Sequence, residues 1–140
     1  MTTITRRGKL WIRALAAAAI VFGLLTIKAG GTVLFGGEAA RAAAGKYVPF
    51  VVWFNFLAGF AYVIAGAGLW SRHRWAVWLA VAIAAATAVV FAAFGVHVGL
   101  GGAYKGLTVG AMTVRTLVWL AIATIGYRKI IRASARELND

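Results

Sequence analysis

The sequence predicts an all-α protein, an integral membrane antiparallel four-helix bundle that forms a single domain over residues 1–140. Three observations predict this fold class. Hydrophobic residues make up 63% of the 140 residues. Four long apolar runs use most of the chain, so there is no room for a separate soluble domain. The connections between the runs are short, and short connections favour antiparallel neighbours.

The first span is expected from about residue 10 to residue 35. Its basic start and apolar continuation mimic a signal peptide, but the apolar part is too long, so we expect an uncleaved helix. Lys28 and a glycine pair interrupt the span. Either the helix stops near Ile27, with Lys28 extending to the membrane surface, or it continues to Phe35. The apolar TVLF after the glycines favours the second alternative.

The second span is expected over residues 49–70, and Pro49 suits the first turn of a helix. In the loop before it, EAARAAA is expected to form a short interfacial helix. Within the span, one amide, one phenol and two glycines recur at intervals of four, three and four residues. This spacing places on one helix face Asn55, Gly59, Tyr62 and Gly66. We expect this face to pack closely on a partly polar neighbour, because small residues let helix backbones approach.

The third span is expected over residues 75–97 and the fourth over residues 107–127. The basic turn SRHRW leads into the third span, which is rich in alanine and therefore suited to close packing. The fourth span contains Arg115. The basic tail after it is expected to be an amphipathic helix that lies along the membrane interface.

Basic residues gather on one side of the predicted bundle. Ten lie in the N-terminal segment, in the turn after the second span and in the tail, against three in the other two loops. This bias predicts that both termini are cytoplasmic, in a multi-pass protein of a bacterial inner membrane. Topology and contact with anionic lipid account for the net charge of +12, so we expect the lipid bilayer and no nucleic acid as a partner.

Three polar residues on three helices are expected at similar depth in the outer half of the membrane. At 1.5 Å per residue, Arg115 and Lys28 lie about 12 Å from the outer ends of their spans, and Asn55 about 9 Å. An arginine at this depth costs about 2.5 kcal/mol or more to insert, so we expect it to face the bundle interior. His97 lies just above these residues, and Glu38 is the only carboxylate on that side.

Two interpretations of these polar residues stay open. In the first they are structural: Arg115 pairs with Glu38 or with helix carbonyls, Lys28 extends outward and Asn55 clamps two helices. In the second they bind a ligand, because a single acid cannot neutralise the surrounding cations. Lipid phosphate, water, a partner subunit, an anion or a quinone-like ligand would then supply the missing groups. The pocket candidates are Lys28, Glu38, Asn55, Tyr62, His97 and Arg115.

The sequence contains few residues or motifs that could support catalysis. The chain has no cysteine, which excludes disulfides, thiol relays and iron–sulfur clusters. His73 and His97 would lie about 36 Å apart along a helix and cannot ligate one haem. Paired carboxylates, HExxH, a nucleophile with a base and a phosphate loop are all missing from the sequence. We therefore expect neither a metal site nor a catalytic residue, and we do not expect the chain to be an enzyme on its own. No cofactor is evident from the sequence, although a quinone is compatible with it.

Two segments carry a resemblance to a known family. FNFLAGFAYVIAGAGLWSRHRWAVWLA places a polar residue before a glycine-rich helix, a basic turn and an Ala/Leu-rich helix, and GLLTIKAGGTVLFGG places a lysine between glycines. With four spans over residues 14–127, the chain resembles the DoxX-like membrane proteins. Some relatives are the membrane subunit of a thiosulfate–quinone oxidoreductase, and others accompany redox or stress-response partners. The resemblance implies candidate pocket roles for Lys28 and Asn55; relatives often carry an acid at the position of Asn55.

Two functional hypotheses follow. The first is a DoxX-like accessory or structural subunit of a membrane redox system linked to quinone, in contact with a membrane protein partner or with a second copy of the chain. The second is a small anion channel or transporter with a basic pocket in the outer leaflet, because Lys28, Asn55 and Arg115 supply donors and positive charge. The spans hold no carboxylate of the kind that small drug exporters use.

Overall fold

The computed structural model describes residues 6–139, and these residues form helices and turns without any strand. Residues 1–5 and Asp140, which belong to the expected domain, lie outside the described part. The helices in chain order are α1 (Arg6–Phe35), α2 (Gly37–Ala44), α3 (Pro49–Trp70), α4 (Arg74–Gly99), α5 (Gly106–Gly126), the π-helical turn η1 (Tyr127–Ile131) and α6 (Arg132–Glu137). The all-α prediction is confirmed for residues 6–139.

Four helices of the described chain are long and apolar enough to cross a membrane. They are α1, α3, α4 and the continuous helix from Gly106 to Glu137. Large apolar side chains are exposed on all four, for example Leu25, Leu57, Val89 and Leu117, each more than half exposed. This length and composition indicate a multi-pass membrane protein, because lipid and not water suits such surfaces.

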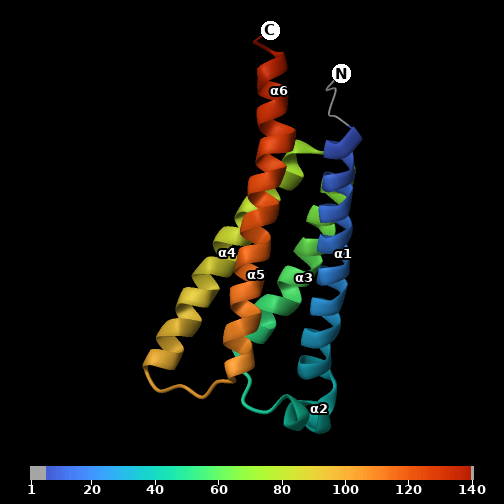
Figure 1. Cartoon of the computed structure of the whole chain (residues 1–140). Helices are drawn as coiled ribbons and strands as arrows, with labels where there is room; N and C mark the ends of the chain where they lie inside the picture. Colours follow the sequence, from blue (N-terminus) through green and yellow to red (C-terminus); the bar gives the residue numbers. More distant parts are fainter. Residues whose placement is uncertain (1–5, 140) are drawn as a thin grey trace.

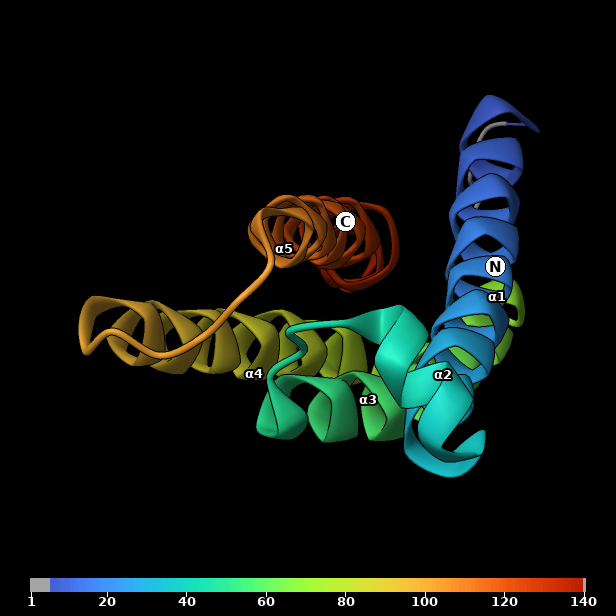
Figure 2. The same ribbon diagram turned by 90° about the horizontal axis from the view of Figure 1, so that it is seen from below.

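The long helices alternate in direction along the chain (Figure 1). α1 runs away from the N-terminus, α3 returns, α4 runs away again, and α5 with α6 leads back to the C-terminus, so both described ends lie at one end of the molecule. The most extensive packing between two long helices is that of α1 on α3, and α4 packs to a smaller and equal extent on α3 and on α5. Seen from below, the backbone of α5 stands apart from that of α1 (Figure 2).

Glycines bring the backbones of α1 and α3 into contact. A Cβ atom on Gly23 would lie 2.8 Å from the carbonyl oxygen of Gly59, and one on Gly66 would lie 2.9 Å from the carbonyl oxygen of Ala16. Real Cβ atoms do not come this close to backbone oxygen, so only glycine fits at these crossing points. The face of α3 that holds Gly59 and Gly66 therefore packs on α1, as the spacing of its small and polar residues predicts.

The structure supports most of the expected helix bounds. The second span is matched at both ends by α3, and the short helix expected in the first loop is α2. α1 continues through the glycine pair to Phe35, as the second alternative holds, although it begins at Arg6, earlier than expected.

The expectation for the tail is wrong. α6 continues along the axis of α5 instead of lying across it, because η1 keeps the helix unbroken between them (Figure 1). The basic tail residues therefore extend beyond the end of α5.

The turn between α3 and α4 is a Schellman motif with arginine where glycine is usual. The backbone N–H of His73 donates to the carbonyl of Gly68 at 2.9 Å, and that of Arg72 to Leu69 at 2.9 Å. Arg72 has φ 56°, and it is the one residue other than glycine with positive φ in the described chain. The left-handed conformation costs a side-chain-bearing residue about 1–2 kcal/mol.

Candidate functional site

A cavity of about 170 Å³ lies where α1, α3 and α5 meet, and we call it the α1–α3–α5 cavity. The cavity has small and apolar walls with three polar side chains among them. Its lining consists of Thr26, Ala29, Gly30, Val33, Val52, Asn55 and Arg115. Gly30 faces the Cβ atom of Phe56 so closely that an added Cβ would stand 3.0 Å from it. Two of the predicted pocket residues, Asn55 and Arg115, therefore meet at one cavity.

Arg115 faces the interior, as its depth predicts, and only 8% of its surface is exposed. Its guanidinium carbon lies 5.4 Å from the ring centroid of Phe22 on α1. Its Nη1 donates a long hydrogen bond to Sδ of Met112 at 3.8 Å, and its Nε has no partner. Aromatic and sulfur contacts thus hold the side chain, while among residues 6–139 no carboxylate pairs with it. The positive charge stays uncompensated inside the fold.

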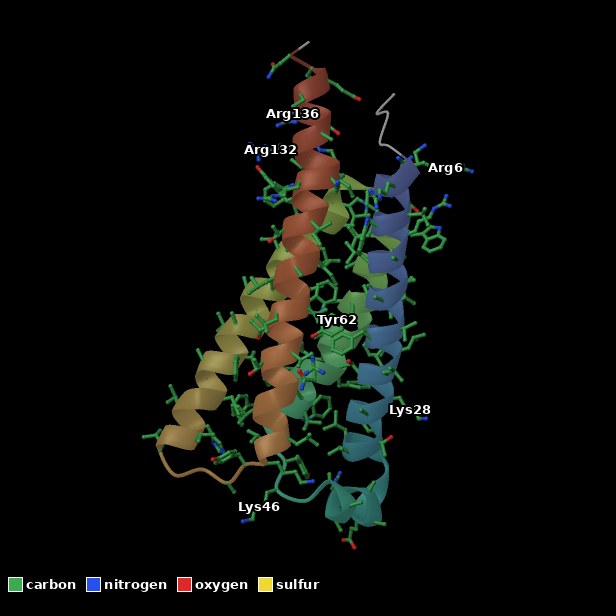
Figure 3. The ribbon with its side chains drawn as sticks, viewed as in Figure 1. Arg6, Lys28, Lys46, Tyr62, Arg132 and Arg136 are labelled. Atoms are coloured by element: carbon green, nitrogen blue, oxygen red, sulfur yellow. The ribbon has the colours of Figure 1, made fainter. Side chains whose placement is uncertain are left out.

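Aromatic rings fill the space between α1 and α5 beside Arg115. The rings of Phe22 and Tyr62 stack at 5.7 Å, and those of Tyr62 and Trp119 lie 4.6 Å apart. Tyr62 and Trp119 are both fully buried. Figure 3 shows Tyr62, carried by α3, in the space between the ribbons of α1 and α5. These rings link helices whose backbones stay apart and form a wall next to the cavity.

Five buried side-chain atoms of the described chain have no hydrogen-bond partner. They are Oδ1 of Asn55, Oη of Tyr62, Oγ1 of Thr87, Nε of Arg115 and Nε1 of Trp119. The Tyr62 side chain neighbours both Arg115 and Thr87. Each unsatisfied buried polar group costs about 1–3 kcal/mol, so such groups are rare and call for an explanation. Two of the five residues, Asn55 and Arg115, line the α1–α3–α5 cavity, which indicates a place for a polar ligand or for ordered water.

The structure does not bring the other predicted residues to this cavity. Lys28 is exposed and points away from the neighbouring helices (Figure 3). Glu38 is exposed on α2. Nε2 of His97 lies 3.1 Å from the carbonyl oxygen of Ala103, and the ring meets Phe50 edge-on at 6.0 Å. His97 therefore fastens the loop between α4 and α5.

Three residues of the site, Phe22, Thr87 and Trp119, are missing from the predicted set. Trp119 follows Arg115 by four residues, so helical spacing alone puts the two on one face. Its position in mid-span, away from the interfaces where tryptophan is enriched, is a second signal. Thr87 is a single hydroxyl in the middle of an alanine-rich span. Nothing in the sequence marks Phe22. Its contact with Arg115 depends on α5 lying next to α1, which the sequence does not show.

Residues 6–139 hold no group of three or more His, Asp or Glu side chains that could bind a metal ion. The polar groups that line the α1–α3–α5 cavity are the guanidinium of Arg115, the amide of Asn55 and the hydroxyl of Thr26, and each of them can donate a hydrogen bond. They suit a ligand that offers acceptor oxygen atoms.

The chain matches no protein-family model, no curated protein and no solved structure.

Proposed function

We propose that this chain is a four-span, antiparallel protein of a bacterial inner membrane, with cytoplasmic termini, that binds a small ligand carrying acceptor oxygens in the α1–α3–α5 cavity. The ligand class we favour is the head group of a quinone, and the role is that of an accessory subunit in a membrane redox system. The observation that carries the proposal is the buried Arg115, which lines the cavity with no carboxylate partner and with Nε unpaired.

The size and lining of the cavity support a ring-sized, lipophilic ligand. A cavity of about 150 Å³ holds benzene, whereas drug-sized molecules need about 300 Å³ or more. The α1–α3–α5 cavity, at about 170 Å³, falls in the first range. Its apolar wall of Ala29, Val33 and Val52 suits a ring, and Arg115 and Asn55 offer hydrogen-bond donors. A quinone is neutral, partitions into lipid and presents two carbonyl acceptors. Its ring therefore suits the apolar wall, and its carbonyl oxygens suit the hydrogen-bond donors.

The resemblance of the first two spans to DoxX-like proteins supports the accessory role. Some proteins of that family accompany redox partners, although most have no assigned activity, and a bound quinone would supply electron-carrier chemistry. The residues of this chain would bind and orient the ring.

A second candidate is an anion site, which the uncompensated charge of Arg115 favours. A channel or transporter would need further donors along a path, and Lys28 was expected to supply one. Lys28 instead points outward from α1, away from the ribbon of α5 (Figure 3), and it does not line the cavity. The geometry therefore supports binding at one point more than conduction along a series of sites.

Arg115→Leu tests the proposal, and Lys28→Met is a matched control because it removes one positive charge from another span without touching the cavity. Each protein is purified from its native membrane in mild detergent, and bound quinone is measured by solvent extraction and mass spectrometry. We expect wild type and Lys28→Met to carry equal amounts of quinone. We expect Arg115→Leu to carry at least about five-fold less, since losing a hydrogen bond to a charged donor costs about 1.5–3 kcal/mol.

The variant is expected to assemble, because replacing an unpaired buried charge with an apolar side chain removes a desolvation cost. If Arg115→Leu elutes as wild type does and retains the same quinone, the proposal is wrong. Flux of halide, thiosulfate or organic anions into reconstituted vesicles, lost in Arg115→Leu, would support the anion candidate instead.

A further inference from the structure

A second cavity, of about 200 Å³, lies at the end of the molecule where the described chain begins and ends. Its lining comes from the first turns of α1 and from the turn between α3 and α4, which lie side by side there (Figure 1). The lining residues are Lys9, Ile12, Arg13, Trp70, Ser71 and Arg72. We call it the basic cavity. It shares no residue with the α1–α3–α5 cavity.

The basic cavity is lined by three cations and no acid. Lys9, Arg13 and Arg72 contribute half of its lining residues. The acids of the described chain, Glu38 and Glu137, lie elsewhere. Three like charges around one small cavity repel one another, and an anion between them turns this repulsion into attraction.

Lys9, Arg13 and Arg72 are exposed, and the fold constrains the side chain of Arg13 and the backbone of Arg72. The guanidinium carbon of Arg13 lies over the ring of Trp70 at 5.6 Å from its centroid, so an aromatic contact favours its place beside the cavity. Arg72 occupies the left-handed position of the Schellman turn at φ 56°, where glycine is unstrained. The chain thus carries a charged side chain at a backbone position that disfavours any side chain. Strained residues of this kind are concentrated at functional sites.

We propose that the basic cavity binds a phosphate-bearing anion. Guanidinium groups match phosphate oxygens in a bidentate geometry, and an ammonium such as that of Lys9 adds a third charged donor. The phosphate has two sources, the head group of an anionic lipid or free inorganic phosphate. Leu10 and Trp11, next in the chain to Lys9, are 67% and 59% exposed and apolar. These residues would contact the acyl region of a lipid whose head group occupies the cavity.

The test is a titration of the purified full-length protein followed by native mass spectrometry. One series uses phosphatidylglycerol, a second uses phosphatidylcholine and a third uses inorganic phosphate. The variants Arg13→Gln and Arg72→Gly each remove one cation from the cavity. Arg74→Gln is the matched control, because Arg74 is exposed at the same end and does not line the cavity. Arg72→Gly also relieves the backbone strain, so its unfolding temperature should be at or above that of wild type.

We expect wild type and Arg74→Gln to bind the anionic ligand with affinities within two-fold of each other. Arg13→Gln and Arg72→Gly should bind it at least five-fold more weakly. If Arg13→Gln and Arg72→Gly lose affinity in the phosphatidylglycerol series alone, the site binds a lipid head group. If they lose affinity for inorganic phosphate, the site binds the free anion. Equal binding by all four proteins in both the phosphatidylglycerol and the inorganic phosphate series overturns the proposal.

Discussion

At the scale of single residues, the buried charge of Arg115 defines the site. Phe22 and Met112 contact its guanidinium group, but neither carries a negative charge. A cation over an aromatic ring gains about 0.5–2 kcal/mol, which is less than the cost of burying an unpaired charge. The fold therefore holds Arg115 in a position that favours an acceptor ligand.

Tyr62→Phe removes one unpaired hydroxyl and keeps the ring that stacks on Phe22 and Trp119. The unfolding temperature in detergent should stay equal or rise, because the hydroxyl costs about 1 kcal/mol or more while it lacks a partner. Tyr104→Phe is the control, since Tyr104 is 42% exposed. A clear fall in unfolding temperature for Tyr62→Phe, with none for Tyr104→Phe, would show that the hydroxyl is bonded and contradict this account.

The depth of Arg115 and Asn55 in their spans predicts that these polar side chains face the interior of the bundle. The structure places both at one cavity. The same argument misplaces Lys28, because depth says nothing of the direction in which a side chain points. Direction depends on the helix face. Gly23, Thr26 and Gly30 are buried on α1, and Lys28 lies on the opposite side of the helix from them.

At the scale of elements, the α1–α3 pair is the most closely packed part of the described chain. Its contact depends on glycines, so a single added methyl group has a defined effect. In Gly23→Ala the new Cβ would lie 2.8 Å from the carbonyl oxygen of Gly59 and 2.8 Å from Cγ2 of Val63. Relief of such a contact requires the helices to move apart.

Gly23→Ala should therefore lower the free energy of unfolding by about 1–3 kcal/mol, the usual cost of overpacking. Gly110→Ala is the control, because nothing lies within 4 Å of a Cβ at that position of α5. Alanine there should stabilise the helix by about 0.5–1 kcal/mol. Unfolding in mixed micelles, followed by circular dichroism, gives both values. Equal effects of the two variants would mean that α1 and α3 are not in backbone contact.

Local signals in the sequence predict most helix bounds, for example Pro49 at the start of α3 and Gly36-Gly37 after α1. The continuation of α5 through η1 into α6 could not be predicted in this way. The tail has the composition of an interfacial helix, but no residue between Gly126 and Glu137 breaks the helix. The π-helical turn η1 keeps the backbone hydrogen bonds continuous between α5 and α6, so the charged tail residues lie on an extension of α5.

At the scale of the whole molecule, hydrophobicity predicts four long helices, and the structure has four that can span a membrane. The order of packing could not be predicted. α5 packs on α4, and its link to α1 depends on Phe22, Tyr62, Arg115 and Trp119. These side chains bridge an opening between α1 and α5, and the α1–α3–α5 cavity lies within this opening. The opening results from the order in which the helices pack, which the sequence does not show.

The proposed topology is tested by single cysteines, because the chain has none of its own. Ala39→Cys in α2 and Ala103→Cys in the loop between α4 and α5 should react with a membrane-impermeant maleimide in intact spheroplasts. Ala135→Cys in α6 should react only after the membrane is opened. Labelling of Ala39→Cys and Ala103→Cys from different sides would contradict four antiparallel spans, and labelling of Ala135→Cys alone would reverse the orientation.

The central claim is that the α1–α3–α5 cavity binds a quinone-like ligand through Arg115. The most direct measurement is photolabelling of the purified protein with a photoreactive quinone analogue, followed by peptide mapping. The account predicts labels within residues 26–33 of α1 or residues 52–55 of α3. Excess quinone should prevent the labelling, and Arg115→Leu should lower it at least about five-fold while Lys28→Met leaves it unchanged. Labels next to Arg115 on α5 agree with the same site, because Arg115 also lines the cavity. Labels elsewhere in the chain, or equal labelling of wild type and Arg115→Leu, would contradict it.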